Sequence, residues 1–78
     1  MNARKMFEEL GYEIYEEDKF DLVYSNCYTY IKFDKANEEY TQFDNLELNH
    51  EIGYICAFTT KEHQAITQQM KELGWLDD

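Results

Sequence analysis

The sequence predicts one α+β domain over residues 1–78: a short N-terminal helix, an antiparallel meander of four to five strands, and a C-terminal helix packed on one sheet face. Two similar helix endings support this prediction, Leu10-Gly11-Tyr12 and Leu73-Gly74-Trp75. Glycine fits the left-handed position just past a helix, and the aromatic residue after it packs back on the last turn. The third observation is an aromatic content of 17%, because large rings supply the core that so short a chain needs.

An apolar stripe predicts the N-terminal helix. Ala3, Met6, Phe7 and Leu10 recur at i, i+3, i+4 and i+7, which places them on one helical face. Asn2 is the expected N-cap, because its side chain can accept a hydrogen bond from a free backbone N–H group. The basic residues lie near the start and the acidic residues near the end, the reverse of what the helix dipole favours. Packing must therefore stabilise this helix.

The middle of the chain is predicted to form strands, because short runs of β-branched and aromatic residues alternate there with polar turns. Most of the links are short, and short links join antiparallel neighbours, since a parallel pair needs a crossover of about a dozen residues or more. The expected strands cover residues 12–16, 20–25, 27–34, 39–44 and 52–58.

A capping box predicts the start of the C-terminal helix, with Thr59 as the N-cap and Glu62 three residues later. Ile66, Met70 and Leu73 form its apolar stripe, which should lie across one face of the sheet. Trp75 and Leu76 are expected to cover the open end of the core. The core residues that the sequence predicts are Phe7, Leu10, Ile31, Phe33, Ile66, Met70, Leu73 and Trp75.

The net charge is −10, from 17 acidic and 7 basic residues. Such a charge disfavours direct binding to nucleic acid phosphates or to anionic membrane surfaces, so a charged partner is expected to be basic. The longest apolar run, residues 54–58, is far shorter than the roughly 20 residues that span a bilayer. No apolar stretch follows Arg4 and Lys5, so a signal peptide is not expected and the protein is predicted to be cytoplasmic. Cys27 and Cys56 are then expected to be reduced, buried thiols and not a disulfide.

One predicted strand has large side chains on both faces. Tyr28, Tyr30 and Lys32 alternate on one face, and Thr29, Ile31 and Phe33 lie on the other. The C-terminal helix can cover only one face, and tyrosine is enriched at protein interfaces. Tyr28, Tyr30 and Lys32 are therefore the candidate interface, either for a homodimer or for a partner protein. Alternatively, the N-terminal helix or a curled sheet covers these rings. Base stacking on them is disfavoured because positive charge is scarce nearby.

Acidic residues are concentrated between residues 8 and 21. One hypothesis is a nucleic-acid mimic that occupies a basic groove of a host protein, and the alternative is an ordinary solvated surface. A domain of this size should be about 30 Å across, a length over which duplex DNA carries about 18 phosphates. Even the whole net charge on one side would give about half that density. The candidate acidic surface consists of Glu13, Glu16, Glu17, Asp18 and Asp21.

No pattern in the sequence indicates catalysis or a cofactor. His50, His63, Cys27 and Cys56 lack the paired spacing of a metal site. Ser25 is the only serine, and it has neither a nearby histidine nor a glycine-rich elbow. No glycine-rich phosphate loop is present. The sequence therefore predicts no enzyme activity, no metal and no cofactor.

Both terminal segments of the chain resemble segments of known proteins. The residues 1–12, MNARKMFEELGY, and 65–75, AITQQMKELGW, resemble small proteins encoded by prophages and mobile elements of Gram-positive bacteria, with a weaker similarity at residues 31–34. The resemblance covers about a third of the chain. It implies a bacterial cytosolic setting and no assigned chemistry, and it carries over no functional site.

Together these observations predict a small acidic cytosolic protein-interaction domain of mobile-element origin. The alternative is an acidic nucleic-acid mimic that inhibits a host DNA- or RNA-binding protein.

Overall fold

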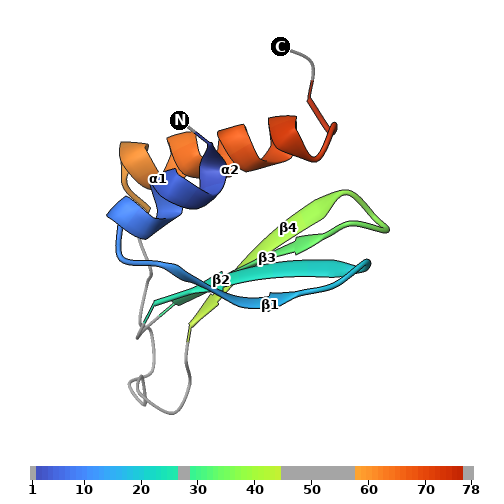
Figure 1. Cartoon of the computed structure of the whole chain (residues 1–78), viewed down its shortest axis with the longest axis horizontal. Helices are drawn as coiled ribbons and strands as arrows, with labels where there is room; N and C mark the ends of the chain where they lie inside the picture. The colour runs from blue at the N-terminus through green and yellow to red at the C-terminus, as the bar shows by residue number, and fades with distance from the viewer. Residues whose placement is uncertain (1, 27–28, 45–57, 77–78) are drawn as a thin grey trace.

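The computed structural model describes residues 2–26, 29–44 and 58–76 and has the predicted α+β architecture. The strands form one antiparallel sheet in the order β1-β2-β3-β4, and both helices lie on the same side of it (Figure 1). The predicted strand over residues 52–58 lies outside the described residues, except for Phe58, which belongs to no strand. The elements are α1 (Ala3–Glu9), β1 (Glu13–Glu17), β2 (Asp21–Ser25), β3 (Thr29–Asp34), β4 (Glu39–Asp44) and α2 (Thr60–Glu72).

The two helix endings have the same geometry, as the sequence predicts. Gly11 and Gly74 adopt φ angles of +92° and +81°, in the region that favours glycine. After α1, the Tyr12 N–H donates to the Phe7 carbonyl oxygen at 2.9 Å. After α2, the Trp75 N–H bonds to the equivalent carbonyl three residues before the cap, also at 2.9 Å. This is the Schellman motif at both ends, and it turns each aromatic residue back toward the core.

The predicted N-caps are present at both helix starts. The Asn2 side chain accepts a hydrogen bond from the Lys5 N–H at 2.9 Å. Thr59 and Glu62 form a complete capping box, in which the Thr59 hydroxyl accepts from the Glu62 N–H at 3.1 Å and Glu62 accepts from the Thr59 N–H at 2.9 Å. These bonds satisfy backbone donors that the helices themselves leave without partners.

Carboxylates of α2 also connect it to the N-terminal part of the chain. Glu72 accepts a hydrogen bond from the Ala3 N–H at the start of α1, at 2.7 Å. Glu62 accepts one from the Tyr12 hydroxyl at 2.6 Å. The two helices therefore form one layer, held at both ends of α2.

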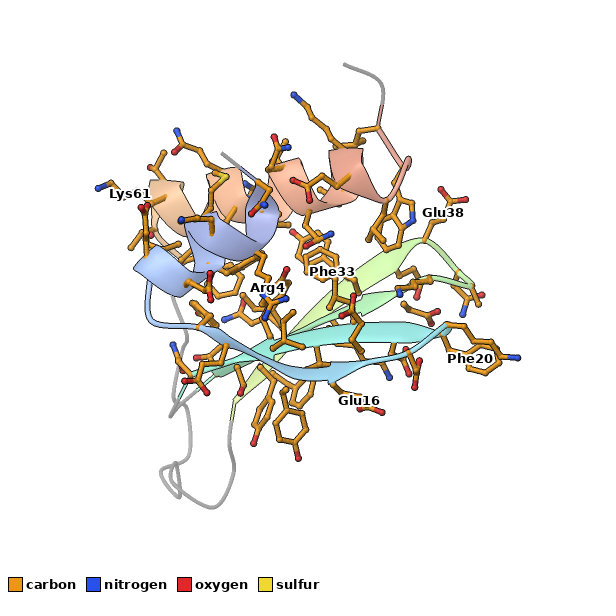
Figure 2. All side chains as sticks on the ribbon, viewed as in Figure 1. Arg4, Glu16, Phe20, Phe33, Glu38 and Lys61 are labelled. Carbon is orange, nitrogen blue, oxygen red and sulfur yellow. The ribbon has the colours of Figure 1, made fainter. Side chains whose placement is uncertain are left out.

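The side of the sheet beneath the helices holds the core. Cross-strand register aligns Ile14, Tyr24 and Ile31 in one row and Leu22, Phe33 and Tyr40 in the next. Figure 2 shows Phe33 between the sheet and the helix layer. The ring of Phe7 stacks on Tyr24 with the centroids 4.1 Å apart and lies edge-on to Tyr12 and Phe33. The buried cluster consists of Phe7, Tyr12, Leu22, Tyr24, Ile31, Phe33, Ala65 and Ile66.

Four of the eight predicted core residues are fully buried: Phe7, Ile31, Phe33 and Ile66. The other four, Leu10, Met70, Leu73 and Trp75, are partly buried and pack against this cluster. The prediction for Leu76 is wrong, because its side chain is 41% exposed and does not cover the core. Tyr12, Leu22 and Tyr24 were not predicted, since their positions depend on which face of the strands the helices cover.

The hairpin between β3 and β4 contains backbone strain at Glu38, whose φ of +53° is left-handed. We expect Glu38→Gly to raise the free energy of unfolding by about 1 kcal/mol, because glycine adopts this conformation without the Cβ clash. Urea denaturation would measure the change. Glu38→Ala is the matched control, since it removes the same charge but keeps the Cβ atom. Equal stabilisation by both substitutions would show that charge, and not strain, is the cause.

Candidate functional site

One face of the sheet is not covered by either described helix, and we call it the open face. Register and strand alternation assign its residues, because side chains at every second position share a face. Among the described side chains, the open face consists of Glu13, Tyr15, Glu16, Asp21, Val23, Ser25, Tyr30, Lys32, Asp34, Glu39, Thr41 and Phe43.

Three aromatic rings lie side by side at one end of the open face. Tyr30 stacks on Phe43 with the centroids 5.1 Å apart and the planes 11° apart, and Tyr15 meets Tyr30 edge-on at 5.1 Å. Tyr15 is 64% exposed and Phe43 is 44% exposed. Val23, in the middle of the face, is buried. These rings, contributed by β1, β3 and β4, form a continuous aromatic surface that reaches solvent.

A β-bulge in β1 determines which acidic residue joins this surface. Ile14 pairs with Tyr24 on the helix side, yet Glu16 pairs with Val23 on the open face, so Tyr15 is the extra residue. Glu16 lies on the side of the sheet away from the helices in Figure 2. The bulge thus places Tyr15 and Glu16 on the same face, which strict alternation along a strand does not allow.

Carboxylates occupy the other end of the open face. Asp21, Asp34 and Glu39 are aligned across β2, β3 and β4. The Lys32 ammonium lies 3.7 Å from the Asp21 carboxylate, with both side chains partly exposed. The pKa of Asp34 is lowered, chiefly because the Asn37 side chain and backbone N–H donate hydrogen bonds to its carboxylate. Asp34 therefore holds its own turn and remains ionised at neutral pH.

The structure separates the predicted acidic surface into different environments. Glu13, Glu16 and Asp21 lie on the open face, whereas Glu17 pairs with Leu22 on the helix side. Asp18 lies in the β1–β2 turn, where its carboxylate accepts hydrogen bonds from the Asp21 and Phe20 N–H groups, each at 2.8 Å. These bonds lower the pKa of Asp18.

Of the predicted interface residues, Tyr30 and Lys32 lie on the open face, and Tyr28 lies outside the described residues. Sequence reasoning missed Tyr15 and Phe43, which complete the aromatic surface. Phe43 has a sequence signal, because it alternates with Thr41 in a predicted strand. The position of Tyr15 depends on the bulge, which nothing in the sequence indicates.

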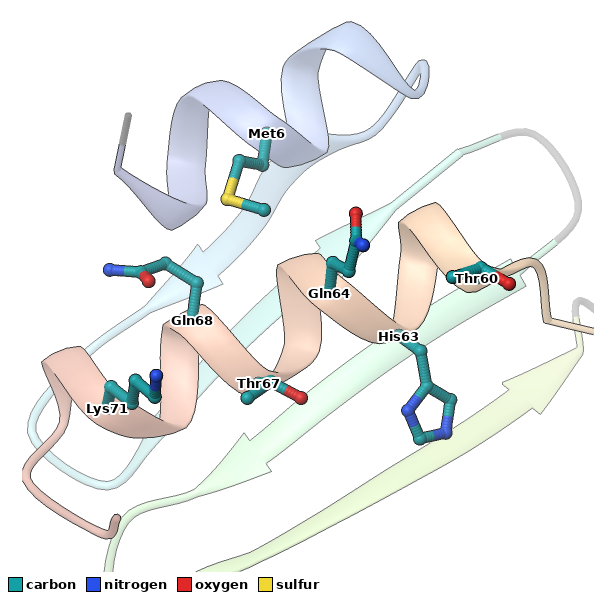
Figure 3. A pocket seen from close by; sticks show the side chains of 7 residues that line it. All are labelled: Met6, Thr60, His63, Gln64, Thr67, Gln68 and Lys71. Atoms are coloured by element: carbon teal, nitrogen blue, oxygen red, sulfur yellow. The ribbon is translucent and has the colours of Figure 1, made fainter. Parts of the chain in front are cut away.

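A second surface feature is an open depression of about 460 Å³ on the helix layer (Figure 3). His63 and Lys71 are its ionisable side chains, and no carboxylate or thiol lines it. The depression is lined by Met6, Thr60, His63, Gln64, Thr67, Gln68 and Lys71.

The described part of the chain has neither a metal-binding group of side chains nor a membrane-spanning helix. Over residues 2–26, 29–44 and 58–76, no three histidine, cysteine or acidic side chains are grouped so that they could hold a metal ion. His50, Cys27 and Cys56 lie outside these residues. Within the same ranges, neither helix has the length and apolar character needed to cross a membrane.

The open face is thus the surface whose composition and exposure best indicate a function. Neither family models, nor curated proteins, nor solved structures give a match to this chain. A functional conclusion therefore depends on the chain's own surface chemistry.

Proposed function

We propose that this chain is a small protein-interaction domain that acts through its open face and has no catalytic activity of its own. One observation carries the proposal: Tyr15, Tyr30 and Phe43 form a contiguous aromatic surface on the side of the sheet that the helices leave uncovered. Aromatic residues are enriched at protein interfaces, and contiguous exposed apolar patches mark binding surfaces. The cytosolic, mobile-element setting belongs to the proposal and is supported by the resemblance of the two terminal segments.

The nucleic-acid mimic receives less support from the arrangement of the acidic residues. Asp21 lies beside Lys32, Asp18 holds a turn, and Glu17 lies on the helix side. A mimic needs a regular row of free charges, because each must replace a phosphate. On the open face, the aligned carboxylates are Asp21, Asp34 and Glu39, and two of them already have partners: Lys32 for Asp21, and Asn37 for Asp34.

Site-specific photocrosslinking in the cells that encode the protein tests the proposal. A benzoylphenylalanine residue at Thr41 reports on the open face, and the same residue at Gln64 reports on the helix layer. Both positions are exposed. We expect Thr41, but not Gln64, to give a discrete crosslinked protein, and we expect Tyr15→Ser with Phe43→Ser to abolish that product. These two rings are exposed, so their loss should leave the fold intact.

The control is circular dichroism of each labelled or substituted protein, which should match the wild type. Crosslinks from Gln64 alone, or a Thr41 product that persists in the double variant, would contradict the proposal. A Thr41 product that disappears when the crosslinking is repeated in cell lysate with added double-stranded DNA would support the mimic instead.

A further inference from the structure

We propose that the open face binds a short basic segment of another protein, with apolar side chains at one end of the segment and arginine or lysine side chains at the other. This inference rests on the proposed function and adds the chemistry of the partner. It follows from three properties of the open face: its charge, the separation of rings from carboxylates, and its area.

The charge of the open face selects against acidic partners. Among the described residues, this face carries five carboxylates and one lysine, a net charge of −4. The lysine is Lys32, and it already lies 3.7 Å from Asp21. Arginine pairs with a carboxylate through two parallel hydrogen bonds, which makes it a suitable partner group here. A segment without basic residues would leave these carboxylates uncompensated.

On β2 to β4, the rings and three of the five carboxylates lie at opposite ends of the strands, whereas the two carboxylates of β1 do not follow this separation. Tyr30 and Asp34 are four residues apart on β3, and Phe43 and Glu39 are four residues apart on β4. Four residues of a strand span about 13 Å. A segment that lies along these strands therefore meets stacked rings first and carboxylates about 13 Å later. The apolar and basic groups of the partner should therefore lie about 13 Å apart.

The area of the open face favours a short segment over a second copy of the chain. Four strands, each five or six residues long, form a surface of about 19 by 18 Å, or roughly 350 Å². A stable dimer usually buries about 800 Å² on each partner. Face-to-face pairing of two copies would also bring two surfaces of charge −4 together. A segment of about six extended residues spans the roughly 18 Å length of the strands without either penalty.

Titration of the full-length protein with synthetic peptides, followed by amide NMR shifts, tests the inference. The probe is a blocked ten-residue peptide with leucine and valine in its first half and three arginines in its second half. The comparison peptides replace the arginines with serine or with glutamate. We expect the arginine peptide to shift amides of β1 to β4 preferentially, to bind at least about tenfold more tightly than the glutamate peptide, and to weaken with added salt.

Two variants separate the contributions of charge and of rings. Asp21→Asn with Glu39→Gln, which removes two of the three carboxylates at the end away from the rings, should weaken the arginine peptide about fivefold. Glu8→Gln with Glu9→Gln is the matched control, because it removes the same charge from exposed positions on α1 and should change binding less than twofold. Tyr15→Ser with Phe43→Ser should weaken all three peptides about tenfold.

Equal binding of the arginine and glutamate peptides would overturn the inference. It would also be overturned if the open-face pair of charge-removing substitutions and the control pair on α1 weakened the arginine peptide equally. Binding of a ten-residue oligothymidylate to the open face would overturn it in favour of a nucleic-acid platform. A dimer in sedimentation at micromolar concentration that protects this face would overturn it in favour of a second copy.

The crosslinking experiment distinguishes failure of this inference from failure of the proposed function. If Thr41 crosslinks to a partner whose contacting segment is acidic or uncharged, this inference fails and the proposed function stands. Absence of any Thr41 product refutes the proposed function itself.

Discussion

Replacing Phe7 with alanine should lower the free energy of unfolding by about 3 to 5 kcal/mol. Its side chain is 0% exposed and touches the rings of Tyr12, Tyr24 and Phe33. Alanine would leave a cavity where α1 contacts these three rings. A domain of this length has a total stability of about 4 to 12 kcal/mol, so the loss is a large fraction.

Urea denaturation followed by circular dichroism would measure this loss. Phe20→Ala is the matched control, because that ring is 56% exposed and its removal should cost less than about 0.5 kcal/mol. If Phe7→Ala does not fold, Phe7→Leu should still fold and lose less than about 1.5 kcal/mol. A loss below about 1 kcal/mol for Phe7→Ala would refute the assignment of α1 to the core.

Replacing Tyr24 with phenylalanine should lower the free energy of unfolding by about 1 to 3 kcal/mol. The Tyr24 hydroxyl donates a hydrogen bond to the Gln69 side-chain oxygen at 2.7 Å, and both residues are buried between the sheet and α2. Phenylalanine fills the same space but leaves the Gln69 oxygen without this donor. Thermal or urea denaturation would measure the difference.

The double variant Tyr24→Phe with Gln69→Leu separates the missing hydrogen bond from the loss of packing. It removes both polar partners, so it should be more stable than Tyr24→Phe alone. Tyr30→Phe serves as a control on the open face and should change stability by less than about 0.5 kcal/mol. Equal losses for the single and double variants would contradict a buried donor–acceptor pair.

The same tyrosine makes stability depend on alkaline pH. Burial, and secondarily the Glu72 carboxylate, raises the pKa of Tyr24 from 10.0 to about 12. Folding therefore favours the neutral phenol, and this contribution is fully present below pH 10 and is lost as the pH rises through about 12. The difference in absorbance at 295 nm between the wild type and Tyr24→Phe isolates the ionisation of Tyr24, and it should appear as the pH rises toward about 12. A difference that appears near pH 10 would refute the assignment.

Much of the fold is predictable because local chemistry specifies it. Gly11 and Gly74 mark helix ends that few other residues can form, and Thr59 with Glu62 marks a helix start. Each signal involves only residues close together in the sequence. The meander follows from short links for the same reason.

The candidate site is less predictable because it depends on contacts between distant segments. Strand alternation separates Tyr30 from Ile31, but it does not say which face the helices cover. That choice depends on α1 and α2 forming one layer, for which the Ala3–Glu72 hydrogen bond joins residues 69 positions apart. The bulge that adds Tyr15 and Glu16 to the open face also depends on pairing, because it is a shift in the register between β1 and β2. The sequence therefore indicates an aromatic face but not its full composition.

Solvent paramagnetic relaxation of the aromatic ring protons tests most directly whether one sheet face is buried and the other open. A neutral gadolinium chelate added to dilute protein should broaden the rings of Tyr15 and Phe43 strongly. The rings of Phe7 and Phe33 should remain nearly unaffected, because both are 0% exposed and lie between the helix layer and the sheet. Protection of Tyr15 and Phe43 to the same degree as Phe33 would contradict the existence of the open face and of every function assigned to it.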